Sequence, residues 1–235
     1  SQIGCSLRCG FCATAGIPFR RNLSAGEIID QAQALLKASA AGIQNYVYMG
    51  MGEPLANFNA TVASIRILTM DKGIASRRIT VSTAGLVPQI IALSEEGLRI
   101  KLAVSLHSAQ DDTRKKLMSA ARQYNMQELA DALKKWCAIS ESQVTIEYLL
   151  LKDVNDTPCD INSLINFSRS FPCKVNLIQY NEVPGIPFTG SPPEIINHFA
   201  AALTKADIRT TVRRSAGDDI AAACGQLATK ETPDS

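Results

Sequence analysis

The chain has 235 residues, of which 46% are hydrophobic and 20% are charged, and its formal net charge is +2. This composition is typical of a globular protein with one large core, and no run of about 18 apolar residues indicates a membrane span. The N-terminus has no basic-then-apolar signal pattern, and the small net charge neither identifies nor excludes a nucleic-acid partner. We therefore expect a cytoplasmic enzyme that does not bind a membrane.

Three cysteines, Cys5, Cys9 and Cys12, begin the chain with the spacing C-x3-C-x2-C. Their thiolates are close enough in sequence to hold one polynuclear centre, but they are fewer than the four cysteines usual for an iron–sulfur cluster. A cluster held by three would keep one iron open to an outside ligand, as catalytic metal sites do. Zinc would need a further ligand, and the first histidine, His107, is distant. A disulfide with one spare thiol is the other alternative, and we favour the cluster over both.

Beyond the cysteines, short apolar runs alternate with helical patterns along the chain. Strands are predicted at Asn45–Met49, Arg78–Ser82, Ile100–Ser105, Val144–Leu151, Val175–Tyr180 and Thr210–Arg213. Helices are predicted at Ala25–Ala38, Ala60–Thr69, Pro88–Glu95, Gln127–Trp136, Ile161–Arg169 and Ile195–Lys205. This alternation indicates a parallel sheet with crossover helices, and the short apolar strands favour a barrel. The predicted fold is α/β, a partial (β/α)6 barrel of the TIM type, in a single domain over residues 1–235.

Polar residues and glycines collect in the loops after the predicted strands, where barrel enzymes place their chemistry. Gly52 would let the backbone approach a ligand, and Glu53 could accept a hydrogen bond from an amine, although a plain turn would have the same composition. Ser82 and Ser105 add hydroxyl groups at neighbouring strand ends. His107 follows there too, and its role stays open because a lone histidine is more often a packing residue than a ligand.

Several strings of residues, in the same order along the chain, resemble one known family. They are Ser1–Cys5, Phe19–Leu23, Met49–Leu55, Val81–Pro88, Val154–Asp156 and Ala222–Leu227. The cysteine spacing followed by a Gly-Glu-Pro loop is similar to the radical S-adenosylmethionine (SAM) enzymes, whose open iron is chelated by the amino and carboxylate groups of SAM. The likeness is narrower than that superfamily and runs from end to end. The chain resembles the RlmN-type RNA adenine-C2 methyltransferases.

This resemblance implies a role for each matching residue. Cys5, Cys9 and Cys12 would bind a [4Fe–4S] cluster, and Cys224 would carry the methyl group. Without the family match, Cys224 would be interpreted as a buried thiol. The implied SAM contacts are Gly52 and Glu53 at its amine, Ser82, Ser105, Leu106 and His107 around its ribose and carboxylate, and Asn181 at its adenosine half.

The resemblance also implies a reaction. In such enzymes one SAM methylates the cysteine, and a second is cleaved reductively to a 5′-deoxyadenosyl radical that takes a hydrogen from the S-methyl group. The carbon radical then adds to C2 of an adenine in 23S rRNA or tRNA. Because that carbon is electron-poor and its C–H bond is unactivated, polar methylation fails and a low-potential electron source is needed. RNA and an electron donor such as flavodoxin are therefore the implied partners, and we expect a monomer.

Adjacent basic residues are candidates for phosphate contacts with RNA. Arg20–Arg21 and Arg213–Arg214 are favoured because they flank the cysteine loop and the Cys224 segment. Lys134–Lys135 is interpreted as a solvated helix face.

The chain departs from the family at its front and in one loop. Only Ser1–Gly4 correspond to the first barrel strand, so we expect that strand to be truncated and the N-terminal RNA-binding domain to be absent. The upstream cysteine, thought to remove the C2 proton and release the product, is missing too, which predicts a stalled protein–RNA adduct. Met118–Arg122 replaces the family's usual Pro-x-Asn element, close to the expected SAM or RNA region.

Three alternative functions remain. The related adenine-C8 methyltransferases that confer antibiotic resistance use the same cysteines, and only analysis of the modified base separates the two activities. A catalytically impaired RNA-binding homologue would have no reason to keep the cysteine motif, Glu53 and Cys224 together. A radical enzyme that acts on peptides would normally carry further cysteine clusters near its C-terminus, and Cys224 alone does not make one.

Overall fold

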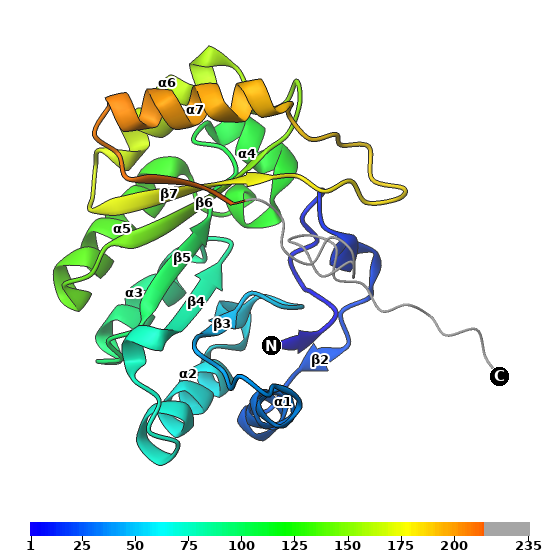
Figure 1. The fold of residues 1–235 in the computed structure, drawn as a ribbon, viewed down its shortest axis with the longest axis vertical. Helices are drawn as coiled ribbons and strands as arrows, with labels where there is room; N and C mark the ends of the chain where they lie inside the picture. Colours follow the sequence, from blue (N-terminus) through cyan, green and yellow to red (C-terminus); the bar gives the residue numbers. More distant parts are fainter. Residues whose placement is uncertain (214–235) are drawn as a thin grey trace.

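The computed structural model describes residues 1–213, which form an α/β fold (Figure 1). Its strands are β1 (Gln2–Ile3), β2 (Arg21–Asn22), β3 (Tyr46–Tyr48), β4 (Ile79–Thr83), β5 (Lys101–Ser105), β6 (Val144–Leu150), β7 (Cys173–Gln179) and β8 (Thr210–Arg213). Its α-helices are α1 (Ala25–Ala38), α2 (Phe58–Arg66), α3 (Val87–Glu95), α4 (Asp111–Leu117), α5 (Met126–Ser140), α6 (Pro158–Ser168) and α7 (Pro193–Lys205).

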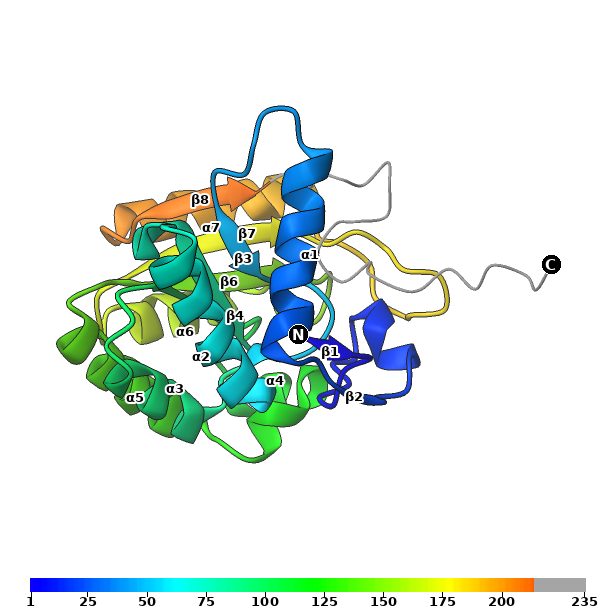
Figure 2. The same cartoon turned by 90° about the horizontal axis from the view of Figure 1, so that it is seen from below.

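Strands β3 to β8 form one parallel sheet whose spatial order follows the chain. The longest ladder joins β6 to β7, from Val144 opposite Cys173 to Leu150 opposite Gln179. Figures 1 and 2 show the sheet curving, with the helices around its outer side. No pairing joins β8 back to β3 within residues 1–213, so the described sheet is an open, partial barrel.

The predicted alternation of strands and helices is confirmed, and the strand boundaries differ from the prediction by at most two residues. Helix α4 was missed because its sequence, Asp111–Leu117, is mostly charged and too short to show a periodic apolar face. Gln2–Ile3, expected as the remnant of a first barrel strand, instead pairs antiparallel with Arg21–Asn22 in a separate ribbon.

Local signals fix where several helices begin. At the start of α1, Ser24 Oγ accepts a hydrogen bond from Glu27 N at 3.2 Å, while Glu27 Oε2 accepts one from Ser24 N at 2.8 Å. This reciprocal capping satisfies two backbone donors that the first helical turn leaves free. Helix α5 begins in the same way at Asn125, and α6 begins at Thr157.

The core lies between the curved sheet and the helices. All seven residues of β6 are buried, as expected for a central strand of a parallel sheet that is covered on both faces. Trp136 of α5 and Phe199 of α7 are among the largest fully buried side chains, and they anchor their helices on the sheet. Among residues 1–213, no helix is long and apolar enough to cross a bilayer.

Candidate functional site

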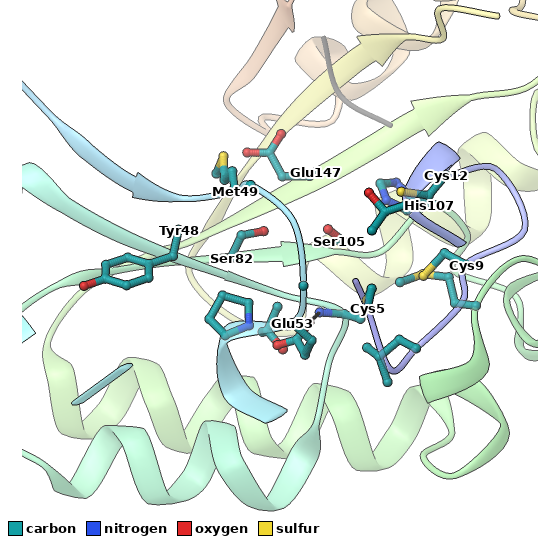
Figure 3. A pocket seen from close by; sticks show the side chains of 18 of the residues that line it. Cys5, Cys9, Cys12, Tyr48, Met49, Glu53, Ser82, Ser105, His107 and Glu147 are labelled. Atoms are coloured by element: carbon teal, nitrogen blue, oxygen red, sulfur yellow. Dashed lines mark hydrogen bonds between the residues drawn. The ribbon is translucent and has the colours of Figure 1, made fainter. Parts of the chain in front are cut away.

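One cavity lies at the carboxyl ends of the parallel strands, the edge where barrel enzymes place their chemistry. Figure 3 shows the N-terminal cysteines on one side of this cavity, facing residues from the ends of several strands. The segments that meet there are far apart in sequence and come together only through the sheet. The lining residues that the sequence had predicted are Cys5, Cys9, Cys12, Gly52, Glu53, Ser82, Ser105 and His107.

The cysteine loop is folded on itself by short-range hydrogen bonds. Cys12 N donates to Cys9 O at 3.1 Å, and Ala15 N donates to Cys12 O at 2.9 Å. Arg8 has a φ of 46°, in the left-handed region, which turns the chain between Cys5 and Cys9. All three cysteines are partly buried free thiols, so the disulfide alternative is not what the structure contains.

The surroundings of these thiols suit a polynuclear centre. Burial raises the pKa of Cys9 to about 12, and the charges of Cys12 and Cys5 act in the same direction. Thiolates that repel one another in a buried site need nearby positive charge, which metal ions supply. Within residues 1–213, no three Cys, His, Asp or Glu side chains are arranged to hold one metal ion. Cluster ligands bind different irons and need not converge.

The end of α4 supports the cysteine loop from one side. Gly10 N donates to Leu117 O at 2.9 Å, and Ser119 Oγ donates to a loop carbonyl, that of Leu7. Met118, between these two contacts, is buried and lines the cavity. The segment in which the family's Pro-x-Asn element is replaced therefore holds the loop that carries the cysteines.

The β1–β2 ribbon closes the base of the cysteine loop. Gln2 lies opposite Asn22 and donates from Nε2 to Asn22 Oδ1 at 2.8 Å, while its Oε1 accepts from Glu53 N at 3.0 Å. Gly52 has a φ of +93°, and a Cβ there would lie 2.5 Å from Gln2 Cβ. From the sequence, we expected the missing side chain of Gly52 to let the backbone come close to a ligand. In the structure, the group that comes this close is Gln2.

Glu53 joins the loop after β3 to the end of β4. Its side chain is only 5% exposed; Oε1 accepts from Leu55 N at 3.0 Å, and Oε2 accepts from Ala84 N at 2.8 Å. Burial raises the pKa of Glu53 to about 7, against the opposing effect of hydrogen bonds from Ala84, Thr83 and Leu55. A carboxylate has about four lone-pair sites, and three donors use three of those of Glu53, so it can still accept one hydrogen bond from a ligand.

His107 is held in a fixed position just after β5. It has a φ of 56°, its Nδ1 accepts from Leu149 N at 3.1 Å, and its ring packs edge-on against Phe11 with 4.8 Å between centroids. Asn155 Nδ2 donates to His107 O at 2.5 Å. Burial lowers the pKa of His107 to about 3, and the charge of Arg114 acts in the same direction. The imidazole is therefore neutral, and because Nδ1 accepts, the proton is on Nε2.

Arg114 of α4 is a buried cation that the sequence did not reveal. Its side chain is 1% exposed; Nη2 donates to Ala84 O at 2.7 Å, and Nε donates to Leu106 O at 3.2 Å, which ties together the ends of β4 and β5. Nη1 is buried with no partner in the described part of the chain. Burial lowers the pKa of Arg114 to about 10, and the charges of Cys9 and Asp111 oppose this. Its positive charge thus acts on a cysteine of the motif.

Two predicted site residues do not line the cavity, and a third cannot be placed relative to it because it falls outside residues 1–213. Leu106 is fully buried, and Asn181 follows β7; neither is among the residues that line the cavity. Cys224 lies outside the described residues. The predicted contacts of all three with SAM or a methyl group stay predictions.

The predicted basic pairs differ from one another in the structure. Arg213, at the end of β8, lines the cavity, while Arg214 lies outside the described residues. Arg21 forms an ion pair with the capping glutamate of α1 at 2.7 Å, so its charge is already paired. Lys134 and Lys135 each pair with an acidic side chain on an exposed helix face, as the sequence indicated.

Comparisons with known proteins identify the family. The sequence model of the radical SAM superfamily matches residues 1–165. The chain is 43% identical, over 98% of its length, to the probable dual-specificity RNA methyltransferase RlmN of Flavobacterium psychrophilum, and it covers 68% of that protein. The chain belongs to the RlmN family of radical SAM enzymes.

Solved structures of radical SAM proteins share this fold. The crystal structure of a radical SAM methyltransferase from Sphaerobacter thermophilus matches with a TM-score of 0.93 and 42% identity, covering 96% of this chain and 67% of that one. Streptococcus suis SuiB bound to S-adenosylmethionine matches with a TM-score of 0.67 and 17% identity, covering 92% of this chain and 49% of that one. The second likeness shows a shared fold alone.

Radical SAM enzymes use a [4Fe–4S] cluster and SAM, and this member of the RlmN family uses both. Its own residues fit these cofactors. Free thiols from one loop line a cavity together with a buried carboxylate and hydroxyl groups at the strand ends.

Proposed function

We propose that this chain methylates C2 of adenine in 23S rRNA and tRNA, with SAM as the methyl source and Cys224 as the methyl carrier. Its identity of 43% to a relative named as a dual-specificity RNA methyltransferase supports the proposal. The structural observation that carries it is the meeting of three free cysteines with strand-end side chains in one cavity.

Cys5, Cys9 and Cys12 would hold the cluster, which together with SAM supplies one-electron chemistry able to act at an unactivated carbon. The contacts of Gly10 with Leu117 fix the loop that presents these thiols. The buried positions of Phe11 and Met118 beside them keep bulk water from that side of the cavity.

Side chains at the strand ends would bind and orient SAM. Glu53 can accept a hydrogen bond from the amino group, because one lone pair remains beyond those used by Leu55, Ala84 and Thr83. Ser82 and Ser105 offer hydroxyl groups to the ribose. Neutral His107 adds no positive charge near the sulfonium, which a protonated imidazole would repel.

Cys224 would accept the first methyl group as a thiolate, the strongest nucleophile among common protein side chains. The residues next to it in the sequence, Ala221–Gly225, are small and would leave room for an RNA base. Arg20 and Arg213 would contact phosphates, which position RNA without reading its sequence. The target adenine must leave its stack to reach the cavity. The enzyme would act in the cytoplasm, with a low-potential donor such as flavodoxin as its partner.

The decisive experiment is nucleoside mass spectrometry after incubation of cluster-loaded protein with SAM, reductant and either tRNA or a 23S rRNA fragment. We expect adenine modified at C2 with the wild type, either released as 2-methyladenosine or held in the stalled protein–RNA adduct, and neither species with Cys224→Ala. Cys137→Ala, which changes a half-buried thiol outside the cavity, is the matched control and should keep the activity. The product 8-methyladenosine would establish the other regiochemistry, and the absence of both methylated adenosine and a protein–RNA adduct with either RNA would refute the proposal.

A second measurement tests the carrier alone. Peptide mass spectrometry of the anaerobically purified protein should find the segment Ser215–Lys230 heavier by one methylene, located on Cys224. An unmodified Cys224 in protein that holds a full cluster and added SAM would contradict its role.

A further inference from the structure

Glu147 has a buried carboxyl group, one side of which borders the cavity. It is the single charged residue of β6, its side chain is 5% exposed, and it lines the same cavity as the cysteines. In the sheet it lies opposite Ser105 of β5 and Asn176 of β7. Ser105, Glu147 and Asn176 therefore form a polar row across three neighbouring strands, on the face of the sheet that lines the cavity.

Only one of the two Glu147 oxygens is satisfied. Oε1 accepts from Asn176 Nδ2 at 3.0 Å, whereas Oε2 is buried and has no partner among the described residues. Asn176 is fixed in turn, because its Oδ1 accepts from Thr211 Oγ1. A buried acceptor without a donor is unfavourable and rare in native proteins, so Oε2 requires a partner that residues 1–213 do not provide.

The electrostatic surroundings of Glu147 favour its role as a hydrogen-bond acceptor. Burial raises the pKa of Glu147, and this is opposed first by the hydrogen bond from Asn176 and then by the charges of Arg213 and Lys174. A carboxyl in this setting repels phosphate and carboxylate groups and attracts hydroxyl or amino donors. Figure 3 shows Glu147 and Glu53 at separate places around the cavity, so the two carboxyls face different parts of a bound molecule.

We propose that Oε2 of Glu147 accepts a hydrogen bond from a hydroxyl or amino group of an adenosine moiety bound in this cavity. The inference rests on the proposed function, in which both SAM and the target nucleotide bring an adenosine to the site. Adenosine carries uncharged donors, the ribose hydroxyls and the 6-amino group, and no anionic group of its own. Ser105, next to Glu147 in the sheet, would complete a polar edge for the same moiety.

The test compares Glu147→Gln with the wild type in equilibrium binding of three probes: SAM, 5′-deoxyadenosine with methionine, and an RNA hairpin that contains the target adenosine. Gln keeps an oxygen for Asn176 and replaces the unpaired acceptor by a donor. The matched control is Glu141→Gln, which removes an exposed carboxyl at the end of α5. Losing a hydrogen bond to a charged group should weaken binding about ten- to a hundredfold.

Weaker binding of both SAM and 5′-deoxyadenosine would assign the contact to the adenosine of SAM. Weaker binding of the hairpin alone would assign it to the target nucleotide. Weaker binding of SAM with unchanged 5′-deoxyadenosine would place Glu147 at the amino-acid end and overturn the inference, as would equal binding of every probe. A wild type that binds none of the probes would instead refute the proposed function.

A second variant guards against misfolding. Glu147→Met combined with Asn176→Leu removes both hydrogen-bonding partners, a change that is often neutral or stabilising when the groups are not needed for folding. We expect this double variant to melt at or above the wild-type temperature and to lose adenosine binding. A double variant with wild-type affinity would overturn the inference.

Discussion

The contact between Gly52 and Gln2 leads to a sharp prediction about stability. In Gly52→Ala, the new Cβ would lie 2.5 Å from Gln2 Cβ and 2.9 Å from Gln2 N, a backbone atom that cannot swing away. The φ of +93° adds strain of about 1–3 kcal/mol for any residue with a side chain. If Gln2 moves, Glu53 N loses its acceptor in a buried place, which costs about 1–3 kcal/mol more.

Together these effects should lower the free energy of unfolding by about 4 kcal/mol, or the melting temperature by about 8–16 °C for a chain of this size. Urea and thermal denaturation of the purified protein measure both quantities. The control is Gly50→Ala in the same loop, where a Cβ would have nothing within 4 Å, and it should change stability by less than about 0.5 kcal/mol. Equal melting of the two variants would refute the role assigned to Gln2.

Three further changes test the site. After anaerobic reconstitution, the Cys9→Ser variant should contain little iron and sulfide, whereas Cys137→Ser should contain as much of both as the wild type. A full iron content in Cys9→Ser would show that Cys9 is not a cluster ligand. Arg114→Met should lower the free energy of unfolding by about 2 kcal/mol, because the buried carbonyls at the ends of β4 and β5 lose their donor; unchanged urea unfolding would argue against this. His107→Gln should flatten the acid dependence of stability. The folded-state pKa of about 3 lies below the unfolded value of about 6.5, so the wild type loses up to about 1.4 kcal/mol per pH unit as the pH falls between these values. The pH dependence that buried carboxyls contribute is the same in both proteins, so it cancels in the difference between their free energies of unfolding. Parallel pH profiles of stability for the wild type and the variant would contradict a neutral, buried His107.

The fold was readable from the sequence because each strand is a short apolar run that is followed by a helical pattern. Parallel strands in chain order bring their carboxyl ends to one edge, so the predicted convergence of Glu53, Ser82, Ser105 and His107 followed from topology alone. Long-range contacts were not readable. Nothing near Gly52 in the sequence indicates that Gln2 packs on it, since the pair is joined through a ribbon of only two residues per strand.

Burial of charge was the other feature hidden from the sequence. Arg114 stands in a basic stretch with Lys115 and Lys116, and one-dimensional patterns do not separate the buried cation from its exposed neighbours. Glu147 is easier to recognise in the sequence, because a lone carboxyl within an apolar strand is uncommon and requires a hydrogen-bond partner. That signal identifies an unusual residue but not the unpaired oxygen, which depends on the position of Asn176 in the next strand.

The β1–β2 ribbon has a consequence for how the protein handles its metal. Because Gln2 and Ile3 pair with Asn22 and Arg21, backbone pairing of the chain itself joins the two ends of the cysteine loop. The entropy of closing that loop is lost during folding and not when the cluster assembles. Small zinc domains, by contrast, fold only when the metal arrives. The pairing of β1 with β2 therefore lowers the entropy that cluster assembly has to overcome, because the three cysteines already lie on a closed loop.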